Sequence, residues 1–368
     1  MNFSYWELDF RLKNVDFLII GGGIVGLSSA FHLKKRFPDA KVMVVERDFI
    51  SAGASSRNAG FACFGSPSEI LDDAMQWGWD AAMETVQLRI QGLELLKQYI
   101  PFTQMEGQWR DGFEIFQSSD LKELEAVRDQ WSILKENCER YLGHFPFSMD
   151  RNQWGFRDIQ EVIRIMGEGV LHPAKMLGAW QERCRFLGVE LVYGLNIDGV
   201  NMKDGSVQIR DVVLTPGKLI ICTNGLTSSL IEGLDVIPAR NQVLVTNEIL
   251  ERPWDCSFHQ RKGYVYFRSI GRRVLIGGAR DLFKSQEYTD SLDIDDSIIR
   301  HLTEHLQAIL GHENFEIAHQ WSGIMGLGNG KGPIIQKIGD SVYVAVRMGG
   351  MGVAIGTAVG KRLSEIIE

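Results

Sequence analysis

Three glycines near the N-terminus have the spacing of a dinucleotide-binding turn. Gly21, Gly23 and Gly26 follow the apolar run FLII and open a segment with helical periodicity. In a G-x-G-x-x-G turn the first glycine permits the tight turn, the second lets the backbone approach a pyrophosphate, and the third lets helix and strand pack closely. The helix N-terminus, at Ile24 and Val25, then presents unpaired N–H groups and a positive dipole to the phosphates.

A carboxylate at the end of the next apolar run strengthens this prediction. Glu46 closes KVMVV about twenty residues after the glycines, where an acidic residue holds a ribose hydroxyl in such folds. Its charge would repel a 2′-phosphate, which favours NAD or FAD over NADP. We expect Arg47 to lie over the adenine rather than to bind phosphate. A purely structural glycine turn is the alternative, and the strand–turn–helix context disfavours it.

The same succession of strand, glycine turn and helix recurs near the C-terminus, in VAVRMGGMGVAIGTAVG from Val344 to Gly360. Gly349 and Gly350 follow the apolar run, and three further glycines continue at helical spacing. Two interpretations are open at this point. The chain binds two nucleotides, or its two ends meet at one.

The elements that must position these turns alternate between strand and helix at both ends of the chain. Between them, residues 242–278 alternate apolar and polar side chains, which indicates an antiparallel sheet. Periodicity predicts helices over residues 24–36, 68–99, 120–141, 173–188, 295–310 and 352–367, and a hairpin over residues 107–119. We therefore predict an α/β nucleotide-binding domain interrupted by an antiparallel-sheet α+β substrate domain.

Composition excludes several classes of protein. The 368 residues carry a net charge of −8, which argues against a nucleic acid partner. The five cysteines are odd in number, widely spread and without a C-x-x-C pair, so neither a disulfide framework nor a metal site is expected. No stretch approaches the roughly 18 apolar residues of a spanning helix, and the N-terminus lacks an apolar signal core. We expect a cytoplasmic protein without a transmembrane segment, and an oligomer is compatible with the sequence.

A set of motifs in order gives the chain a family resemblance. They are FLIIGGGIVGLSSAFHL with VVERD, GASSRNAGF, GVLHPAKMLGAWQERCRFLGVEL, LIICTNGLTSSL, YVYFRSIGRRVLIGGARD, WSGIMGLGNGKGPII and VYVAVRMGGMGVAIGTAVG. Through them the chain resembles, nearly end to end, the FAD-dependent amino-acid and amine oxidoreductases of the D-amino-acid oxidase group, which includes glycine oxidase and monomeric sarcosine oxidase.

The resemblance implies one dinucleotide site rather than two. It implies a Rossmann-type FAD-binding domain, similar to that of glutathione reductase, built from residues 1–75, 150–240 and 320–368. Residues 76–149 and 241–319 would form the interleaved substrate domain. The C-terminal glycine turn would then close on the flavin of the cofactor whose adenine lies near Glu46.

The resemblance also assigns cofactor-binding positions. Glu46 would hold the adenosine ribose, and the backbone of Ile197 would pair with adenine. The pyrophosphate and flavin would be lined by Ser55, Ser56, Arg57, Asn58, Ala59 and Gly60. The phosphates would also lie near Thr223, Asn224 and Gly225. The flavin pyrimidine would receive backbone N–H groups from Gly349, Gly350, Met351, Gly352, Val353 and Ala354.

The chemistry implied is oxidation of a C–N bond in a small amine or amino acid. A hydride passes to flavin N5, the imine is hydrolysed, and dioxygen or another acceptor reoxidises the flavin. The position of the relatives' carboxylate-binding arginine holds Met325, and their oxygen-activating lysine falls at or near Ile276. The cysteine that some relatives bond to flavin corresponds to Gly323, so non-covalent FAD is expected.

These departures leave the substrate and the reaction partner open. Either the substrate has no carboxylate near its reacting carbon, or Arg268, Arg347 or Arg240 has taken over, although each could equally form a salt bridge or a backbone cap. Tyr266, Met325 and Met348 are further pocket candidates. The SYWE segment brings the chain closer to gamma-glutamylputrescine-type amine oxidoreductases. A dehydrogenase using an acceptor other than oxygen, and a flavin-binding redox sensor without turnover, remain alternatives.

Overall fold

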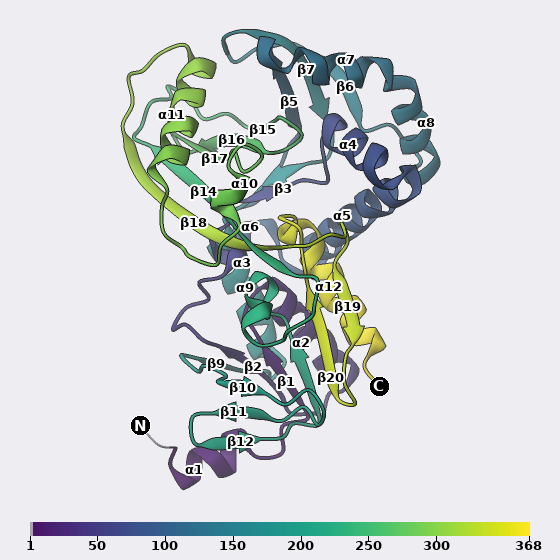
Figure 1. The fold of residues 1–368 in the computed structure, drawn as a ribbon, viewed down its shortest axis with the longest axis vertical. Coiled ribbons are helices and arrows are strands. Elements are labelled where there is room, and N and C mark those ends of the chain that lie inside the picture. Colours follow the sequence, from purple (N-terminus) through teal and green to yellow (C-terminus); the bar gives the residue numbers. More distant parts are fainter. Residues whose placement is uncertain (1–2) are drawn as a thin grey trace.

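Most strands of the described chain belong to two large sheets, one in each half of an elongated molecule (Figure 1). In the computed structural model, which describes residues 3–368, they form a six-stranded sheet, an eight-stranded sheet and two three-stranded sheets. The six-stranded sheet has the order β19-β20-β13-β1-β2-β9. Its strands are β1 (Phe17–Ile20), β2 (Val42–Glu46), β9 (Glu190–Tyr193), β13 (Lys218–Ile221), β19 (Ile334–Lys337) and β20 (Val342–Val346).

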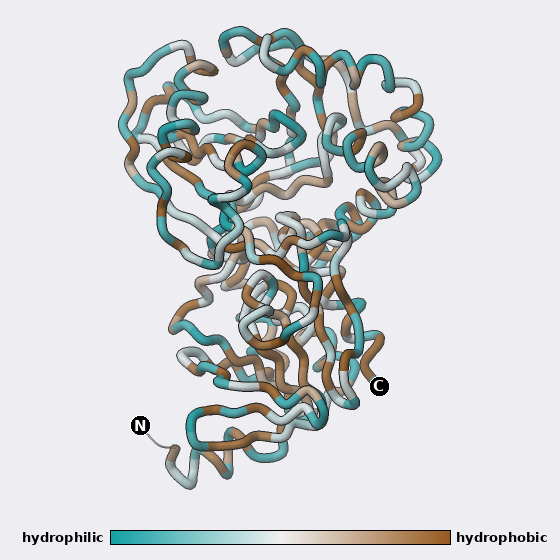
Figure 2. Tube along the Cα trace, in the orientation of Figure 1, coloured by the Kyte–Doolittle hydropathy of each residue, from teal (hydrophilic) through white to brown (hydrophobic). Residues whose placement is uncertain are grey.

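The six-stranded sheet is parallel except for β19 and is buried on both faces. All four residues of β1 are buried, and they alternate between two cores. Phe17 and Ile19 pack beneath the helices, whereas Leu18 and Ile20 join the core on the opposite face. This accounts for the continuous apolar runs, since a strand covered on both faces has no polar side. Figure 2 shows these strands largely in the hydrophobic colour.

Helices from both ends and from the middle of the chain cover one face of this sheet. They are α2 (Ile24–Arg36), α9 (Pro173–Phe186) and α12 (Gly352–Ile366). A Cβ at Gly356 would lie 2.6 Å from Ile24, and one at Gly360 would lie 2.6 Å from Ser28. The glycines of α12 therefore let it pack directly on α2, which brings the two glycine turns to one place. The opposite face carries the sheet of β10 (Gly199–Val200), β11 (Val207–Ile209) and β12 (Val212–Leu214).

The eight-stranded sheet has the order β18-β14-β17-β16-β15-β5-β7-β6, and among its pairings only β15 with β5 is parallel in the described chain. Its strands are β5 (Gly112–Gln117), β6 (Phe147–Asp150), β7 (Ile159–Ile165), β14 (Ile237–Thr246), β15 (Ser257–Gln260), β16 (Val265–Ile270), β17 (Arg273–Gly278) and β18 (Ile317–Leu327). Apolar side chains of α11 (Asp296–Leu310) pack into the core of this sheet. A further core holds α4 (Pro67–Trp77), α5 (Trp79–Tyr99), α7 (Leu121–Asp129) and α8 (Trp131–Leu142).

The remaining elements join the halves or lie at their edges. The small sheet of β3 (Phe61–Ala62), β8 (Gly169–Val170) and β4 (Gln108–Trp109) lies between them, beside α6 (Phe102–Met105) (Figure 1). Helix α5 meets α12 so closely that a Cβ at Gly92 would lie 1.9 Å from the Ala354 oxygen. The short helical segments are α1 (Tyr5–Glu7), η1 (Leu8–Leu12), α3 (Ala54–Arg57), η2 (Ser118–Asp120), η3 (Asn224–Ser229) and α10 (Lys284–Glu287).

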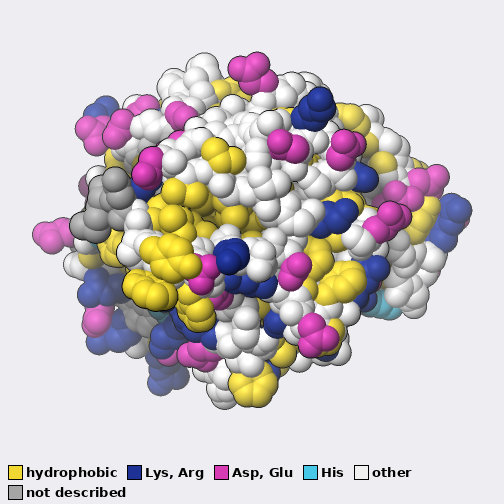
Figure 3. All heavy atoms as spheres, turned by 90° about the horizontal axis from the view of Figure 1, so that it is seen from below, with side chains coloured by type: hydrophobic (Ala, Val, Ile, Leu, Met, Phe, Trp, Pro, Cys, Tyr) yellow, Lys and Arg dark blue, Asp and Glu magenta, His cyan; other side chains and the backbone are white. Residues whose placement is uncertain are grey.

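The lower end of the molecule carries exposed aromatic side chains. Tyr5, Trp6 and Phe10 of α1 and η1 are at least two-thirds exposed. Seen from below, this end gathers hydrophobic side chains next to lysines and arginines (Figure 3). Tyr5 and Trp6 belong to the SYWE segment, so its aromatic side chains lie at the surface. Within residues 3–368, no helix is long and apolar enough to cross a membrane.

The structure corrects three local predictions. The helix expected over residues 68–99 breaks at Gly78, whose φ is +85°, and the one over 120–141 breaks at Gln130. The hairpin expected over residues 107–119 is wrong, because β4 pairs with β8 whereas β5 pairs with β7 and β15. Distant strands outcompete the short local turn, as tertiary pairing commonly does.

The proposed division into domains remains a prediction. Three strands lie across or beyond the domain boundaries that it expects. β7 belongs to the eight-stranded sheet although it follows the expected boundary at residue 150. β14 and β18 run across the boundaries expected at residues 240 and 320. These two long strands extend from the upper sheet toward the lower half (Figure 1).

Candidate cofactor and substrate site

A cavity of about 720 Å³ extends along the carboxyl ends of the parallel strands and under the eight-stranded sheet. The segments following β1, β2, β13 and β20 line one part of it, and α4 and residues of β14, β16 and β18 line another. Ligands of open α/β sheets bind outside the carboxyl ends of the strands. The volume lies within the range of small-molecule and cofactor sites, about 300–1,000 Å³.

The N-terminal glycine turn lines this cavity through Gly21, Gly23, Ile24 and Val25. Gly21 has a φ of +109°, and a Cβ there would lie 2.8 Å from the Cys222 oxygen. Gly26 faces inward instead, where a Cβ would lie 2.0 Å from the Gly21 oxygen. The first turn of α2 thus opens into the cavity with N–H groups that have no intrahelical partner. Ser55 Oγ accepts one of them, from Ile24, at 3.0 Å.

Glu46 lies where its carboxylate also organises the turn. One oxygen accepts the Gly22 N–H at 2.9 Å, and the other accepts the Asp48 N–H at 3.3 Å. Glu46 lines the same end of the cavity as Arg47 and Ile197. Arg47 is more than half exposed and lies 3.9 Å from Asp48. The predicted adenosine contacts are therefore gathered at one place.

The segment around α3 forms a second wall. Asn58 ties it together, because its amide donates to the Ala54 and Ser55 oxygens and its side-chain oxygen accepts the Gly60 N–H. Arg57 donates to the Ser322 oxygen at 3.0 Å, while its Nε is buried and has no hydrogen-bond partner among the described residues. Of the predicted residues in this segment, the cavity is lined by Ser55, Arg57, Asn58 and Ala59.

Two predicted residues of this segment lie outside the lining as the structure describes it. The Ser56 hydroxyl donates to the Ser51 oxygen, which turns it into the loop. Gly60, with φ +77°, abuts the Leu171 oxygen, where a Cβ would come within 2.2 Å. Both shape the loop rather than the surface of the cavity.

Asn224 couples the β13 turn to the C-terminal glycine turn. Its φ is +48°, and its side-chain oxygen accepts the N–H groups of Arg347 and Met348, each at 3.1 Å. Thr223 and Asn224 line the cavity, as does every residue from Met348 to Ala354. Gly225 instead packs on the Met325 oxygen, 2.3 Å from the position of a Cβ. The distant glycine-rich ends therefore meet on one cavity.

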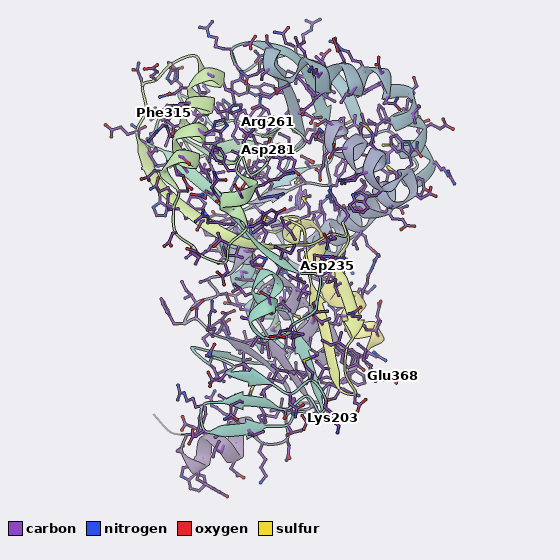
Figure 4. All side chains as sticks on the ribbon, viewed as in Figure 1. Lys203, Asp235, Arg261, Asp281, Phe315 and Glu368 are labelled. Carbon is purple, nitrogen blue, oxygen red and sulfur yellow. The ribbon has the colours of Figure 1, made fainter. Side chains whose placement is uncertain are left out.

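The three arginines considered for a substrate carboxylate are engaged elsewhere. Arg268 donates to the Ala59 and Leu171 oxygens at 2.8 and 3.1 Å, and burial lowers its pKa to about 10. Arg347 pairs with Asp235, which lies at the waist of the molecule (Figure 4), and donates to the Gly332 oxygen. Arg240 pairs with the buried Glu287 at 2.8 Å. As the structure describes the cavity, none of the three lines it.

The other pocket candidates do line the cavity. Tyr266 accepts a hydrogen bond from Asn241 at 3.0 Å, and burial raises the pKa of its phenol. Met325 and Met348 also line it, and a Cβ at Gly350 would lie 3.2 Å from the Met325 sulfur. Trp321 is not among the residues that line the described cavity, and its indole N–H donates to the Arg57 oxygen at 2.8 Å.

The part of the cavity near Tyr266 is also lined by charged residues, which the sequence analysis missed. Lys331 pairs with Asp73 at 2.6 Å and lies 3.8 Å from Glu69, and Lys262 pairs with Asp72 at 2.7 Å. Burial raises the pKa of Asp73. Although burial opposes it, Arg89 and Lys331 hold the pKa of Glu69 below its usual value. The α4 carboxylates are thus neutralised by cations from other segments.

Arg280 is the exception among these cations. Its guanidinium lies 5.3 Å from the centre of the Tyr264 ring, and it forms no ion pair within the described chain. The sequence offered one weak signal, because Arg280 is the penultimate residue of the motif YVYFRSIGRRVLIGGARD. Arg261 and Asp281, which precede Lys262 and follow Arg280 in the chain, pair with each other in the upper half of the molecule (Figure 4).

A histidine and a carboxylate form a buried pair at the cavity wall. His259 Nε2 lies 2.9 Å from Glu168 Oε2, and Cys63 has its sulfur within 4.8 Å of the same groups. A tetrahedral ion with ligand distances of about 2 Å would separate its ligands by roughly 3.3 Å, so the 2.9 Å contact marks a hydrogen bond. Burial opposes a charge on His259, but Glu168 outweighs it and raises the pKa.

Comparison with known proteins agrees with this architecture. A family model described as "FAD dependent oxidoreductase" matches residues 16–366. The chain is 26% identical over 372 residues to the probable oxidoreductase OrdL of Rhizobium meliloti (strain 1021), across 96% of this chain and 83% of that protein. It is 33% identical over 126 residues to the gamma-glutamylputrescine oxidoreductase of Escherichia coli (strain K12), across 34% and 28%. The L-proline dehydrogenase from P. horikoshii has the same fold, with a TM-score of 0.75, 17% identity and coverage of 96% and 93%.

These comparisons confirm the predicted family resemblance, the Rossmann-type α/β fold and FAD as the cofactor. The residues present fit that group on structural grounds. Open N–H groups stand at the start of α2, glycine turns leave backbone uncovered, and the buried Arg57 Nε has no partner among the described residues.

Proposed function

The chain belongs to the family of FAD-dependent oxidoreductases, and on that premise we propose that it oxidises the C–N bond of a small amine or amino acid. FAD supplies the hydride acceptor when bound, and the resulting imine is hydrolysed in water. The observation that carries the proposal is one cavity that joins a dinucleotide-binding turn to a charged pocket. Two of the similar proteins are named for oxidising C–N compounds, gamma-glutamylputrescine and L-proline.

We assign the cofactor to the wall formed by the glycine turns. Glu46 and Ile197 would hold the adenosine, and the N–H groups at the start of α2 would hold the pyrophosphate. The flavin would lie along Arg57–Ala59 and residues 349–354, whose N–H groups stabilise charge on its pyrimidine. Gly323 lines the cavity at the position where some relatives carry a flavin-bonding cysteine, which supports non-covalent binding.

We assign the substrate to the pocket under β14, β16 and β18. Tyr266, Met325 and Met348 offer mainly apolar surface, and the charged groups stand around it. Arg280 is the cation best placed to hold a substrate carboxylate, because its guanidinium has no acidic partner in the described chain. Arg280 would then take the role of the relatives' carboxylate-binding arginine, whose position is occupied by Met325 in this chain.

An acceptor other than oxygen is a second candidate, favoured by one observation. Ile276, at the position of the relatives' oxygen-activating lysine, is fully buried among apolar side chains in β17. A dehydrogenase that passes electrons to a quinone or carrier protein would not need that lysine.

Anaerobic flavin bleaching tests the proposal. Purified protein loaded with FAD is expected to be yellow and to be bleached by at least one compound among glycine, sarcosine, D- and L-amino acids, polyamines and their acyl derivatives. Protein that binds no flavin would contradict the proposal. A flavin that no compound bleaches would favour the redox sensor without turnover. Peroxide release in air separates the oxidase from a dehydrogenase that reduces only a dye.

A further inference from the structure

His259 presents one free ring nitrogen to the substrate end of the cavity. The residue lies in β15, is 6% exposed, and lines the cavity with its ring 5.5 Å from that of Phe61. Its Nε2 is held by Glu168, and Nδ1 has no hydrogen-bond partner within residues 3–368. Because Glu168 fixes one nitrogen, the other is oriented for a ligand.

The surroundings of His259 favour its taking up a proton. Glu168 is fully buried and also accepts the Phe64 N–H, so it is fixed beside the ring. Two more carboxyl groups face the imidazole, Glu114 from β5 and Glu69 from α4, with the Cys63 thiol close by. Glu69 is neutralised by Arg89 of α5 at 2.8 Å.

Glu114 contributes less negative charge than its position suggests. Burial raises its pKa to about 7, against the hydrogen bonds that Ser66 and Ser68 donate to it. Glu168 is therefore the carboxylate that balances a positive imidazole, at 2.9 Å. Charge-assisted hydrogen bonds of this kind are about twice as strong as neutral ones.

An amine substrate needs a group that removes a proton. Alkylamines titrate near pH 10, like lysine, so they reach the cavity as ammonium ions. An ammonium nitrogen has no free electron pair to form the C=N bond as hydride leaves the carbon. The proton must therefore be lost before or during oxidation.

Resting on the proposed function, we propose that His259 Nδ1 is the base that removes this proton, with Glu168 as its positioning residue. The substrate N–H bond breaks, its electron pair stays on nitrogen, and a new N–H bond forms at Nδ1. The imidazolium formed is then paired with the Glu168 carboxylate.

The other titratable groups of the pocket are less suited to this task. Lys262 and Lys331 are cations held by carboxylates of α4. Asp72 and Asp73 are engaged in those same ion pairs. Tyr266 has a raised phenol pKa, so it stays protonated at neutral pH. Unlike these groups, His259 has one ring nitrogen held by Glu168 and a second, Nδ1, without a hydrogen-bond partner among the described residues.

The test is the pH dependence of anaerobic flavin reduction in the wild type, His259→Asn and Glu168→Gln. The wild-type rate is expected to rise with pH as His259 loses its proton. His259→Asn should lower the rate by about 10²–10³-fold at neutral pH, abolish that rise, and recover near pH 10 as the amine deprotonates itself. Glu168→Gln should move the rise to lower pH, since the imidazole loses the carboxylate that raises its pKa.

A matched control is His305→Asn, which alters a partly buried histidine outside the cavity lining, hydrogen-bonded to Gln260 at 2.8 Å. It should leave the pH profile unchanged. A wild-type profile in His259→Asn, with flavin content and Tm preserved, overturns the proposal.

NMR titration of the His259 imidazole in the flavin-loaded protein gives a readout independent of turnover. Its pKa should fall in Glu168→Gln, and an unchanged pKa also overturns the proposal. If no amine bleaches the wild-type flavin, the proposed function fails, while this titration still decides whether Glu168 controls the proton on His259.

Discussion

The two ends of the cavity differ in which parts of the chain form their surface. At the cofactor end, backbone and short side chains form the surface, and glycines such as Gly21 and Gly350 have a positive φ that larger residues rarely adopt. At the substrate end, long charged side chains from α4, β15 and the segments after β15 and β18 converge. Few residue types can occupy a turn that depends on backbone geometry, whereas the side chains that line a pocket can be replaced without changing the backbone. The family scaffold can thus persist while the carboxylate-binding arginine is replaced.

The largest effect is expected from adding a side chain at the cofactor end. Gly26→Val would place a Cβ 2.0 Å from the Gly21 oxygen, so the turn must move and the FAD site is lost. We expect purified protein without bound flavin and a free energy of unfolding lowered by about 3 kcal/mol. Flavin absorbance and urea unfolding measure both.

Gly178→Ala is the matched control for that change. A Cβ at Gly178 of α9 meets no atom within 4 Å, its φ is not positive, and Gly178 lies outside the cavity lining. It should keep both flavin and stability. Normal flavin content in Gly26→Val would contradict the assignment of the cofactor to this turn.

The second effect is a pH dependence of the free energy of unfolding that arises from Glu114, near the substrate end of the cavity. Burial raises the pKa of Glu114 to about 7 from 4.5, so its carboxyl contributes full stability below pH 4.5 and loses it as pH rises to about 7. The shift corresponds to about 3 kcal/mol. Glu114→Gln should remove this loss, so that its unfolding free energy declines less between about pH 5 and 8.

Urea unfolding across that pH range measures the difference. Glu125→Gln, which alters an exposed carboxylate of α7, should follow the wild type. If the unfolding free energy of Glu114→Gln falls as steeply with pH as that of the wild type, ionisation of Glu114 does not destabilise the folded state, and the prediction is wrong.

The two ends also differ in how far the sequence predicts them. The glycine turn, Glu46 and the C-terminal turn follow from local spacing, because each lies at the end of a strand whose apolar run is visible. For Arg268 the sequence leaves open a substrate carboxylate or a backbone cap, and the structure shows the cap, because oxygens of Ala59 and Leu171 from distant segments accept its N–H groups. The hairpin over residues 107–119 failed for the same reason, because β8 lies about sixty residues along the chain. Glu168 and His259 meet only in the folded protein.

The third effect distinguishes the two interpretations of the missing arginine. If Arg280 holds a substrate carboxylate, Arg280→Gln should raise KM for carboxylate-bearing substrates about 10–100-fold, the value of one charge-assisted interaction of about 1.5–3 kcal/mol. Amines without a carboxylate should be little affected. Arg272→Gln, at an exposed arginine facing Glu248, is the control. An equal rise in KM for substrates with and without a carboxylate would show that Arg280 does not bind the carboxylate.

The smallest effect is expected where the two ends are tied together. Lys331 follows β18 and reaches Asp73 and Glu69 of α4 across the cavity, but it is one-third exposed, so solvent screening limits the pair to under about 1 kcal/mol. Lys331→Met should raise KM by a few-fold at low salt, with less difference at high salt and with flavin content unchanged. Lys337→Met, at an exposed residue of β19 outside the cavity lining, should change neither. Loss of flavin in Lys331→Met would instead assign this lysine to the cofactor end, and the division of the cavity into two differently built ends would have to move.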